Sequence, residues 1–419
     1  MSDTDFALNK SFNSLTTTNV GDTHTFYDAD NNEVSATLCA VGDHCYVWIA
    51  NDNSDDSASS TTDNKISKEQ AEAVATKFSN TIYDPETAVF GAEYTGATLE
   101  NLVADSDKIS IFIYDIDGDY SSTQTGGTFG FFWAKDLYTD DSTNTSANNN
   151  LRSNETEMFY VDANLLDQYT DMMYSTLAHE FQHMLHFVNK NIAQGLSSST
   201  WFNEMLSMVC EDMMQSKLSI SDNDSPKSRL SYFNNYYNWG LGSWYTDDAV
   251  LISYANSYAF GAYLARNYGG AAFINELATN DSVDFTSISD ALSALGYDRD
   301  TVFDAFAKWA QTLVYTDATE DHPSYNREAE ATVGSYDFTF SAIDLMDWGT
   351  YLTEEDYNND TVTYGPMIYG TSDSVDLAPT SFSVHAISDN SDVTSFTGDV
   401  TLDITTRSSD NEIWYILIK

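Results

Sequence analysis

The pattern of apolar and polar residues changes along the chain from a two-residue period to a helical one. Residues 36–50 alternate, which predicts β-strands near the N-terminus. Residues 65–80 have apolar positions at helical spacing, which predicts a helix. Strands are predicted at 89–94, 109–115, 128–138 and 158–162, and a helical period follows over 165–314. After residue 335 strands are expected again, the last at 413–418.

This order of elements predicts an α+β protein, because runs of strands and runs of helices occupy different parts of the chain. Polar, low-complexity stretches at 51–64 and 139–150 are predicted to be loops. We expect an N-terminal β-rich segment over 1–60, a central domain over 61–330 in which strands precede helices, and a C-terminal β domain over 335–419.

The composition indicates a folded protein with a strongly anionic surface. The chain has 17 Lys and Arg against 65 Asp and Glu, which gives a formal net charge of −48. Its content of 42% hydrophobic and 14% aromatic residues is too high for a disordered chain. Nucleic-acid binding and adhesion to anionic lipid both need clustered basic residues. No stretch approaches the roughly 18 apolar residues of a membrane span. We therefore expect no nucleic-acid partner and no membrane insertion.

The N-terminal sequence and the overall composition together suggest a location. Residues 1–5 are polar and acidic, so they do not form a signal peptide. The composition is similar to that of exported bacterial proteins. The protein is then either cytoplasmic or exported with its signal segment absent from this chain. We expect the second, a secreted or cell-surface bacterial protein.

The three cysteines are too few for a disulfide scaffold. Cys39 and Cys45 flank a hairpin-like stretch and could form a bridge only if the connecting loop has an odd number of residues. The alternative is two small, partly buried thiols. Cys210 stands among apolar residues in a helical pattern, and we expect it in the core.

The clearest chemical signal is an HExxH motif at residues 179–183. On a helix, residues four apart share a face, so His179 and His183 can direct two imidazoles at one metal ion. Glu180 follows at about 100° around the helix and can reach a water on that ion. Apolar residues roughly opposite the histidines would hold the back of this helix; they are Leu177, Phe181, Met184, Leu185 and Val188. The alternative interpretation is two surface histidines beside a glutamate.

A catalytic zinc ion usually has three protein ligands and one open position, so a third ligand is needed. His186 is one candidate, but metalloproteases with a third histidine turn the chain at a glycine before it, and no glycine is present here. Glu204 is the better candidate, because residues 197–213 predict a second helix that could return antiparallel to the first. Glu211, two turns further along, is the alternative.

The motif at 179–183, taken with the sequence Trp-Phe-Asn-Glu-Met-Leu-Ser at 201–207, resembles the hyicolysin-like bacterial metallopeptidases. This family belongs to the gluzincins, which hold zinc with a His, His, Glu ligand set. The resemblance implies that His179, His183 and Glu204 bind one Zn²⁺ ion and that Glu180 is the catalytic base. It also implies a gluzincin-like catalytic domain, in which a mixed sheet precedes the active-site helices.

The sequence departs from the gluzincin pattern after the expected ligand Glu204. Met205 stands where a glycine is usual, and Met208 where an acidic residue often follows one turn later. The groups that orient the two histidines are therefore open, and Asp162, Asp171 and Asp212 are the candidates.

Residues 254–264, which are followed by a double glycine at 269–270, are similar to a helix in the aminopeptidase branch of gluzincins. A tyrosine at the start of that helix stabilises the oxyanion. Counting back from the double glycine places Tyr254 in that role. Tyr258, one turn later, is the competitor, and a packing role for both tyrosines is the third alternative.

A second metal signal consists of Asp115, Asp117 and Asp119, which resemble the start of a calcium loop because carboxylates occur at alternate residues. Position six of such a loop is Tyr120 instead of glycine, and position twelve is Gly126 instead of glutamate. Ca²⁺ binding is one expectation, and an acidic turn after a strand is the other.

These features predict a secreted zinc metalloendopeptidase that hydrolyses polypeptide substrates by a zinc-activated water, with Glu180 as general base. Tyr254 would stabilise the oxyanion, and an edge strand near 128–132 would align an extended peptide. Another zinc hydrolase or an inactive descendant is a second interpretation. A calcium-dependent surface adhesion or binding module with a non-proteolytic zinc site is the third. The oligomeric state is not predicted.

Overall fold

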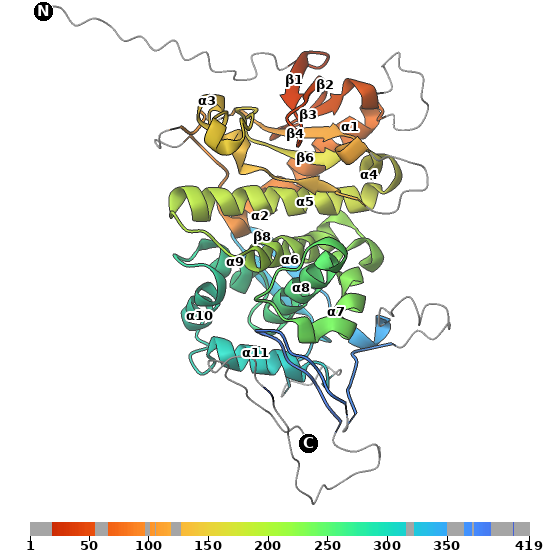
Figure 1. Ribbon diagram of the computed structural model, residues 1–419, viewed down its shortest axis with the longest axis vertical. Helices are drawn as coiled ribbons and strands as arrows, with labels where there is room; N and C mark the ends of the chain where they lie inside the picture. Colours follow the sequence, from red (N-terminus) through yellow and green to blue (C-terminus); the bar gives the residue numbers. More distant parts are fainter. Residues whose placement is uncertain are drawn as a thin grey trace, which may run out of the picture. The chain divides into compact units, whose positions relative to one another are not determined.

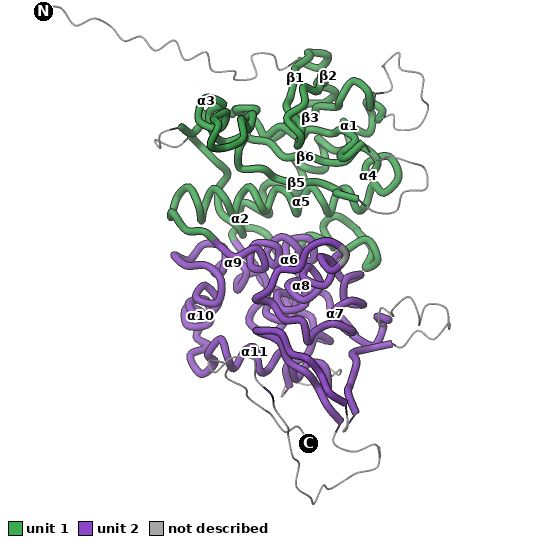
Figure 2. Tube along the Cα trace, in the orientation of Figure 1, with its two compact units in different colours: residues 1–197, 214–225, 334–336 green, residues 198–213, 226–333, 337–419 purple. Residues whose placement is uncertain are grey.

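The computed structural model of the chain describes residues 19–54, 66–96, 101–104, 106–118, 127–315, 322–349, 364–370, 373–386 and 405. These residues fall into two compact units (Figure 2). Unit 1 takes its residues from 1–197, 214–225 and 334–336, and unit 2 from 198–213, 226–333 and 337–419. Both sheet and helix are present, so the predicted α+β class is confirmed.

Unit 1 contains a six-stranded mixed sheet with the order β1-β2-β3-β4-β6-β5 (Figure 1). Its strands are β1 (Thr23–Tyr27), β2 (Glu33–Val41), β3 (Cys45–Ala50), β4 (Ile109–Tyr114), β5 (Gly130–Phe131) and β6 (Met158–Asp162). The pairs β3–β4 and β4–β6 are parallel, whereas the other neighbours are antiparallel. β4 and β6 are buried along their whole length, as parallel strands covered on both faces should be.

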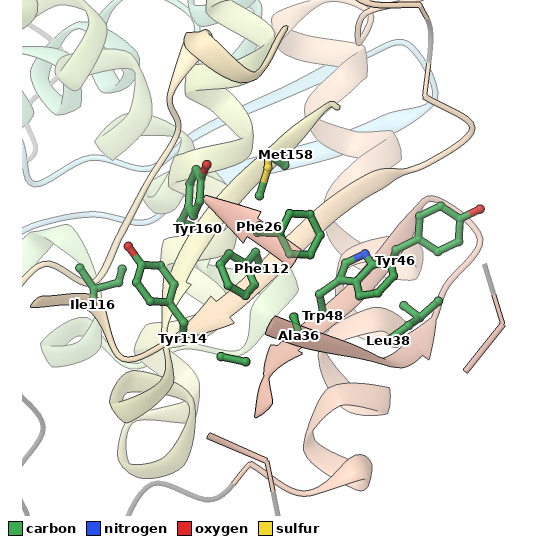
Figure 3. Close-up of a cluster of buried hydrophobic side chains, with 11 residues drawn as sticks. Phe26, Ala36, Leu38, Tyr46, Trp48, Phe112, Tyr114, Ile116, Met158 and Tyr160 are labelled. Atoms are coloured by element: carbon green, nitrogen blue, oxygen red, sulfur yellow. The ribbon is translucent and has the colours of Figure 1, made fainter. Parts of the chain in front are cut away.

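The two faces of this sheet pack differently. One face carries an apolar cluster built from alternate residues of the strands, among them Trp48, Phe112 and Tyr160 (Figure 3). The other face packs against helices: Phe78, just after α1 (Lys68–Lys77), contacts Phe159 of β6 at a ring-centroid distance of 5.8 Å. α5 (Thr170–His186) runs along the sheet in Figure 1 and completes this layer.

Two strand predictions were wrong in whole or in part. Residues 89–94 are not a strand, because Val89 and Phe90 form the last turn of α2 (Tyr83–Phe90), which ends at Gly91 with φ +96°. A short apolar run does not by itself distinguish a strand from a buried helix end. Within 128–138 only β5 is a strand, and a 3₁₀ turn at Ala134–Leu137 follows it.

The helical region predicted over 165–314 is present. Its α-helices are α4 (Ala163–Gln168), α5, α6 (Thr200–Leu218), α7 (Leu230–Tyr236), α8 (Val250–Asn267), α9 (Ala271–Thr279), α10 (Asp284–Ala294) and α11 (Val302–Gln311). The strands β7 (Ala329–Val333) and β8 (Tyr336–Phe340) then form a two-stranded sheet. The strand expected at 413–418 lies outside the described residues. No described helix is long and apolar enough to cross a bilayer.

No disulfide joins any of the three cysteines, all of which belong to the described residues. Cys39 stands where the register between β2 and β3 shifts, and its thiol bonds to the carbonyl of Thr37 at 3.4 Å. Cys45 is buried against the helix layer, where its Sγ lies 3.8 Å from the carbonyl oxygen of Ala75. Cys39 and Cys45 are therefore two separate thiols, which is the second of the two alternatives drawn from the sequence. Cys210 is buried, as predicted.

Candidate metal site

The two histidines of the HExxH motif share one face of α5. The apolar side of the helix is fully buried, with Leu177 and Phe181 at 0% exposure, which holds α5 in place. His179 and His183 remain partly accessible on another side of the helix. Their Nε2 atoms are 3.1 Å apart, and their rings meet at 80°. The four-residue spacing of the two histidines therefore brings one nitrogen of each imidazole close to the other.

This arrangement fits a zinc ion. Zinc–nitrogen bonds are about 2.0–2.1 Å long, and in a tetrahedral site two such ligands are about 3.3 Å apart. The 3.1 Å separation between His179 and His183 is close to that value. Among the described residues, Glu204 on α6 joins the two histidines in a group whose ligand atoms all lie within 4.8 Å of one another. Two imidazole nitrogens and one carboxylate oxygen form a common ligand set for catalytic zinc.

Glu180 follows His179 on α5 and is almost completely buried, with 5% exposure. Strand β5 approaches it closely. A Cβ atom added at Gly130 would lie 3.2 Å from Cγ of Glu180 and 2.9 Å from the Thr176 methyl carbon. Glycine therefore allows the sheet edge to pass directly beside the glutamate. The sequence did not predict this contact, although a glycine inside a strand often marks such a close approach.

His186 is not part of this group of candidate ligands. Its side chain is buried at 4% exposure, and burial lowers the pKa of the imidazole to about 3, with smaller contributions from His183 and Lys190. His186 is therefore a neutral packing residue on α5.

The two tyrosine candidates on α8 have different partners. Tyr254 donates a hydrogen bond of 3.4 Å to Oε1 of Glu204 and is partly accessible. Tyr258 is fully buried and donates to Oδ2 of Asp212 at 3.0 Å. Burial, and then the Asp212 charge, raise the pKa of Tyr258 well above its usual range. Tyr254 therefore adjoins the candidate ligand, whereas Tyr258 belongs to a buried network.

That network fastens α6 to α8. Nη1 and Nη2 of Arg266 bond to the two carboxylate oxygens of Asp212 at 2.7 and 3.1 Å, and both side chains are almost fully buried. Burial would lower the pKa of the Arg266 guanidinium, but the Asp212 carboxylate raises it above its ordinary value. The helices also touch at Gly261, where an added Cβ would lie 2.7 Å from Cγ of Met205. Glu204 and Tyr254 are thus carried by a tightly joined helix pair.

Of the three aspartates suggested as partners of the histidines, two bind other groups and the third is exposed. Asp162 accepts three backbone N–H bonds, two of them at the start of α4, and burial raises its pKa to about 6. Asp212 binds Arg266, and Asp171 is exposed in the first turn of α5. The groups that orient His179 and His183 stay open.

The calcium prediction falls partly outside the described residues. Asp115 follows β4, and a 3₁₀ turn at Ile116–Gly118 contains Asp117 with φ +65°. Asp119, Tyr120 and Gly126 lie outside the described part of the chain. Binding of Ca²⁺ here therefore stays a prediction.

Comparison with known proteins places the chain in a family. A model of the family Peptidase M30 matches residues 33–324, which is most of the chain, and the chain belongs to that family. It is also similar to the neutral metalloprotease ShpI of Staphylococcus hyicus, with 28% identity over 305 residues. The matched region is 68% of this chain and 60% of that protein, so the chain spans about 60% of the relative's length. The resemblance inferred from the two motifs is confirmed.

Proposed function

We propose that this protein is a secreted zinc metalloendopeptidase. The observation that carries the proposal is the group of His179, His183 and Glu204, with Glu180 beside it on α5. Membership of the Peptidase M30 family and the similarity to a neutral metalloprotease support the same activity. In this proposal, residues 61–330 form a gluzincin-like catalytic domain between β-rich segments at 1–60 and 335–419. Secretion is proposed from the composition.

In the proposed mechanism, His179, His183 and Glu204 would hold one Zn²⁺ ion, which would supply a Lewis acid for the scissile carbonyl and for the attacking water. Glu180 accepts a proton from the attacking water and delivers it to the leaving amine. Tyr254 donates a hydrogen bond to the developing oxyanion. β5 is the edge strand of the sheet and passes beside Glu180, so an extended peptide paired with it would be held near the general base.

The proposal is tested by removing the metal. We expect the purified protein to contain one zinc ion per chain and to cleave casein. A chelator should abolish cleavage, and added zinc should restore it. The variant His183→Gln should lose zinc as measured by elemental analysis, because two remaining ligands hold the ion poorly. His385→Gln, a change at an exposed histidine, is the matched control and should keep its zinc. Casein cleavage that is insensitive to chelation would contradict the proposal.

A second experiment separates the two tyrosines. Tyr254→Phe should lower kcat by about 10²- to 10³-fold with little change in KM, because a donor to the transition state is lost. Tyr258→Phe should leave kcat within a few-fold and lower the free energy of unfolding by about 1–2 kcal/mol, because its buried bond to Asp212 is lost. Steady-state kinetics and urea unfolding measure the two effects. The reverse pattern would reassign the oxyanion role.

A further inference from the structure

Arg229 is a partly buried arginine whose charge lies against an aromatic ring. Five other basic side chains of the described residues form ion pairs with carboxylates: Lys68 with Glu72, Lys135 with Asp136, Arg152 with Asp140, Arg266 with Asp212 and Lys308 with Asp300. Arg229 lies partly buried at the end of the 3₁₀ turn Pro226–Arg229. Within the described part of the chain, its guanidinium forms no ion pair or hydrogen bond. The contact that it makes is with an aromatic ring, that of Tyr254.

This contact places the guanidinium close to the proposed reaction site. Cζ of Arg229 lies 5.0 Å from the centre of the Tyr254 ring, and the hydroxyl of the same tyrosine bonds to Glu204. Trp244 packs edge-on against Tyr254, with ring centres 5.1 Å apart. One aromatic side chain therefore separates an arginine charge from a proposed zinc ligand.

The chemistry of this position favours an anionic ligand. A cation–π contact uses no N–H group, so the guanidinium donors of Arg229 remain available. These donors match the two oxygens of a carboxylate. Partial burial of a charge without a counter-ion costs free energy, which a bound carboxylate would offset. The net charge of −48 acts against acidic ligands in general, so binding one at this point needs a local cation.

We propose that Arg229 is a specificity-determining residue that binds a carboxylate of the peptide substrate. The carboxylate belongs either to an Asp or Glu side chain or to the C-terminus of the peptide. This inference rests on the proposed peptidase function and adds a substrate class to it.

The test uses peptides that differ in one carboxylate. Glu and Gln are exchanged at each position around the scissile bond, and each peptide is made with a free or an amidated C-terminus. For the wild-type protein we expect one carboxylate to raise kcat/KM by about ten- to a hundredfold, the range given by one hydrogen-bonded charge pair. The place in the peptide at which a carboxylate raises kcat/KM shows whether Arg229 binds a side chain or the C-terminus.

Arg229→Met should abolish this preference and leave cleavage of the uncharged peptides within about threefold. Arg229→Lys should retain part of it. Arg152→Met, which removes an arginine already paired with Asp140 in unit 1, is the matched control and should retain all of it. An equal loss on acidic and neutral peptides would show that Arg229 only supports Tyr254, and would overturn the inference, as would a wild-type protein that is indifferent to the carboxylate.

Binding measurements separate this inference from the proposed function. Calorimetry on zinc-loaded Glu180→Gln protein should show tighter binding of the acidic peptide than of its amide partner, and the added change Arg229→Met should remove the difference. Equal affinities would overturn the role of Arg229 alone. Failure of the wild-type protein to cleave any peptide would overturn the peptidase function.

Discussion

Replacement of Glu180 by glutamine is expected to lower kcat on a peptide substrate by about 10²- to 10⁴-fold while zinc stays bound. Glutamine has nearly the same shape as glutamate, so the packing of this buried side chain beside Gly130 should persist. A carboxamide cannot accept the proton of the attacking water, and general-base catalysis is lost. His179, His183 and Glu204 are unchanged in this variant, so the ion should remain. Fluorogenic-peptide kinetics and zinc analysis of the same sample measure both quantities.

Glu72→Gln is the control for this experiment, because it makes the same chemical change at an exposed position on α1. Its kcat and zinc content should equal those of the wild-type protein. Retention of more than about a tenth of kcat by Glu180→Gln would contradict the role of general base. Loss of zinc would instead make Glu180 a ligand.

Replacement of Asp212 by asparagine is expected to lower the free energy of unfolding by about 3–5 kcal/mol. The change leaves the Arg266 guanidinium, which is 0% exposed, without its carboxylate. An unpaired buried charge is far more costly than a lost surface ion pair. Because Asp212 and Glu204 share α6, and Arg266 and Tyr254 share α8, activity should fall together with stability. Urea unfolding at fixed zinc content measures the effect.

Two further variants identify the cause of this destabilisation. Glu72→Gln removes an ion pair in which both side chains are more than half exposed, and it should cost less than about 1 kcal/mol. The double change of Asp212→Leu with Arg266→Met should recover much of the stability, because neither charge is then buried alone. If the free energy of unfolding of Asp212→Asn lies within about 1 kcal/mol of the wild-type value, the ion pair between Asp212 and Arg266 is not essential for stability.

The sequence predicted the parts of the candidate site that depend on local geometry. His179 and His183 share a face because a helix repeats every 3.6 residues, and their nitrogens converge as expected. The strands at β4 and β6 were predicted because they are continuous apolar runs. The same criterion failed at 89–94, where the apolar run is the buried end of α2. A run of two or three apolar residues is too short to show the period of a helix or of a strand, so it cannot distinguish them.

The sequence by itself determined the α+β class, the family resemblance, the convergence of His179 and His183, and the choice of Glu204 as a third candidate. Tertiary structure alone decided that Tyr254 adjoins Glu204, that Asp212 binds Arg266, and that the guanidinium of Arg229 lies against the ring of Tyr254. The periodicity of a helix or strand involves neighbours in the chain, so a sequence displays it directly. The partner of a buried charge or hydroxyl is supplied by another element, and only the packing of those elements determines which one it is.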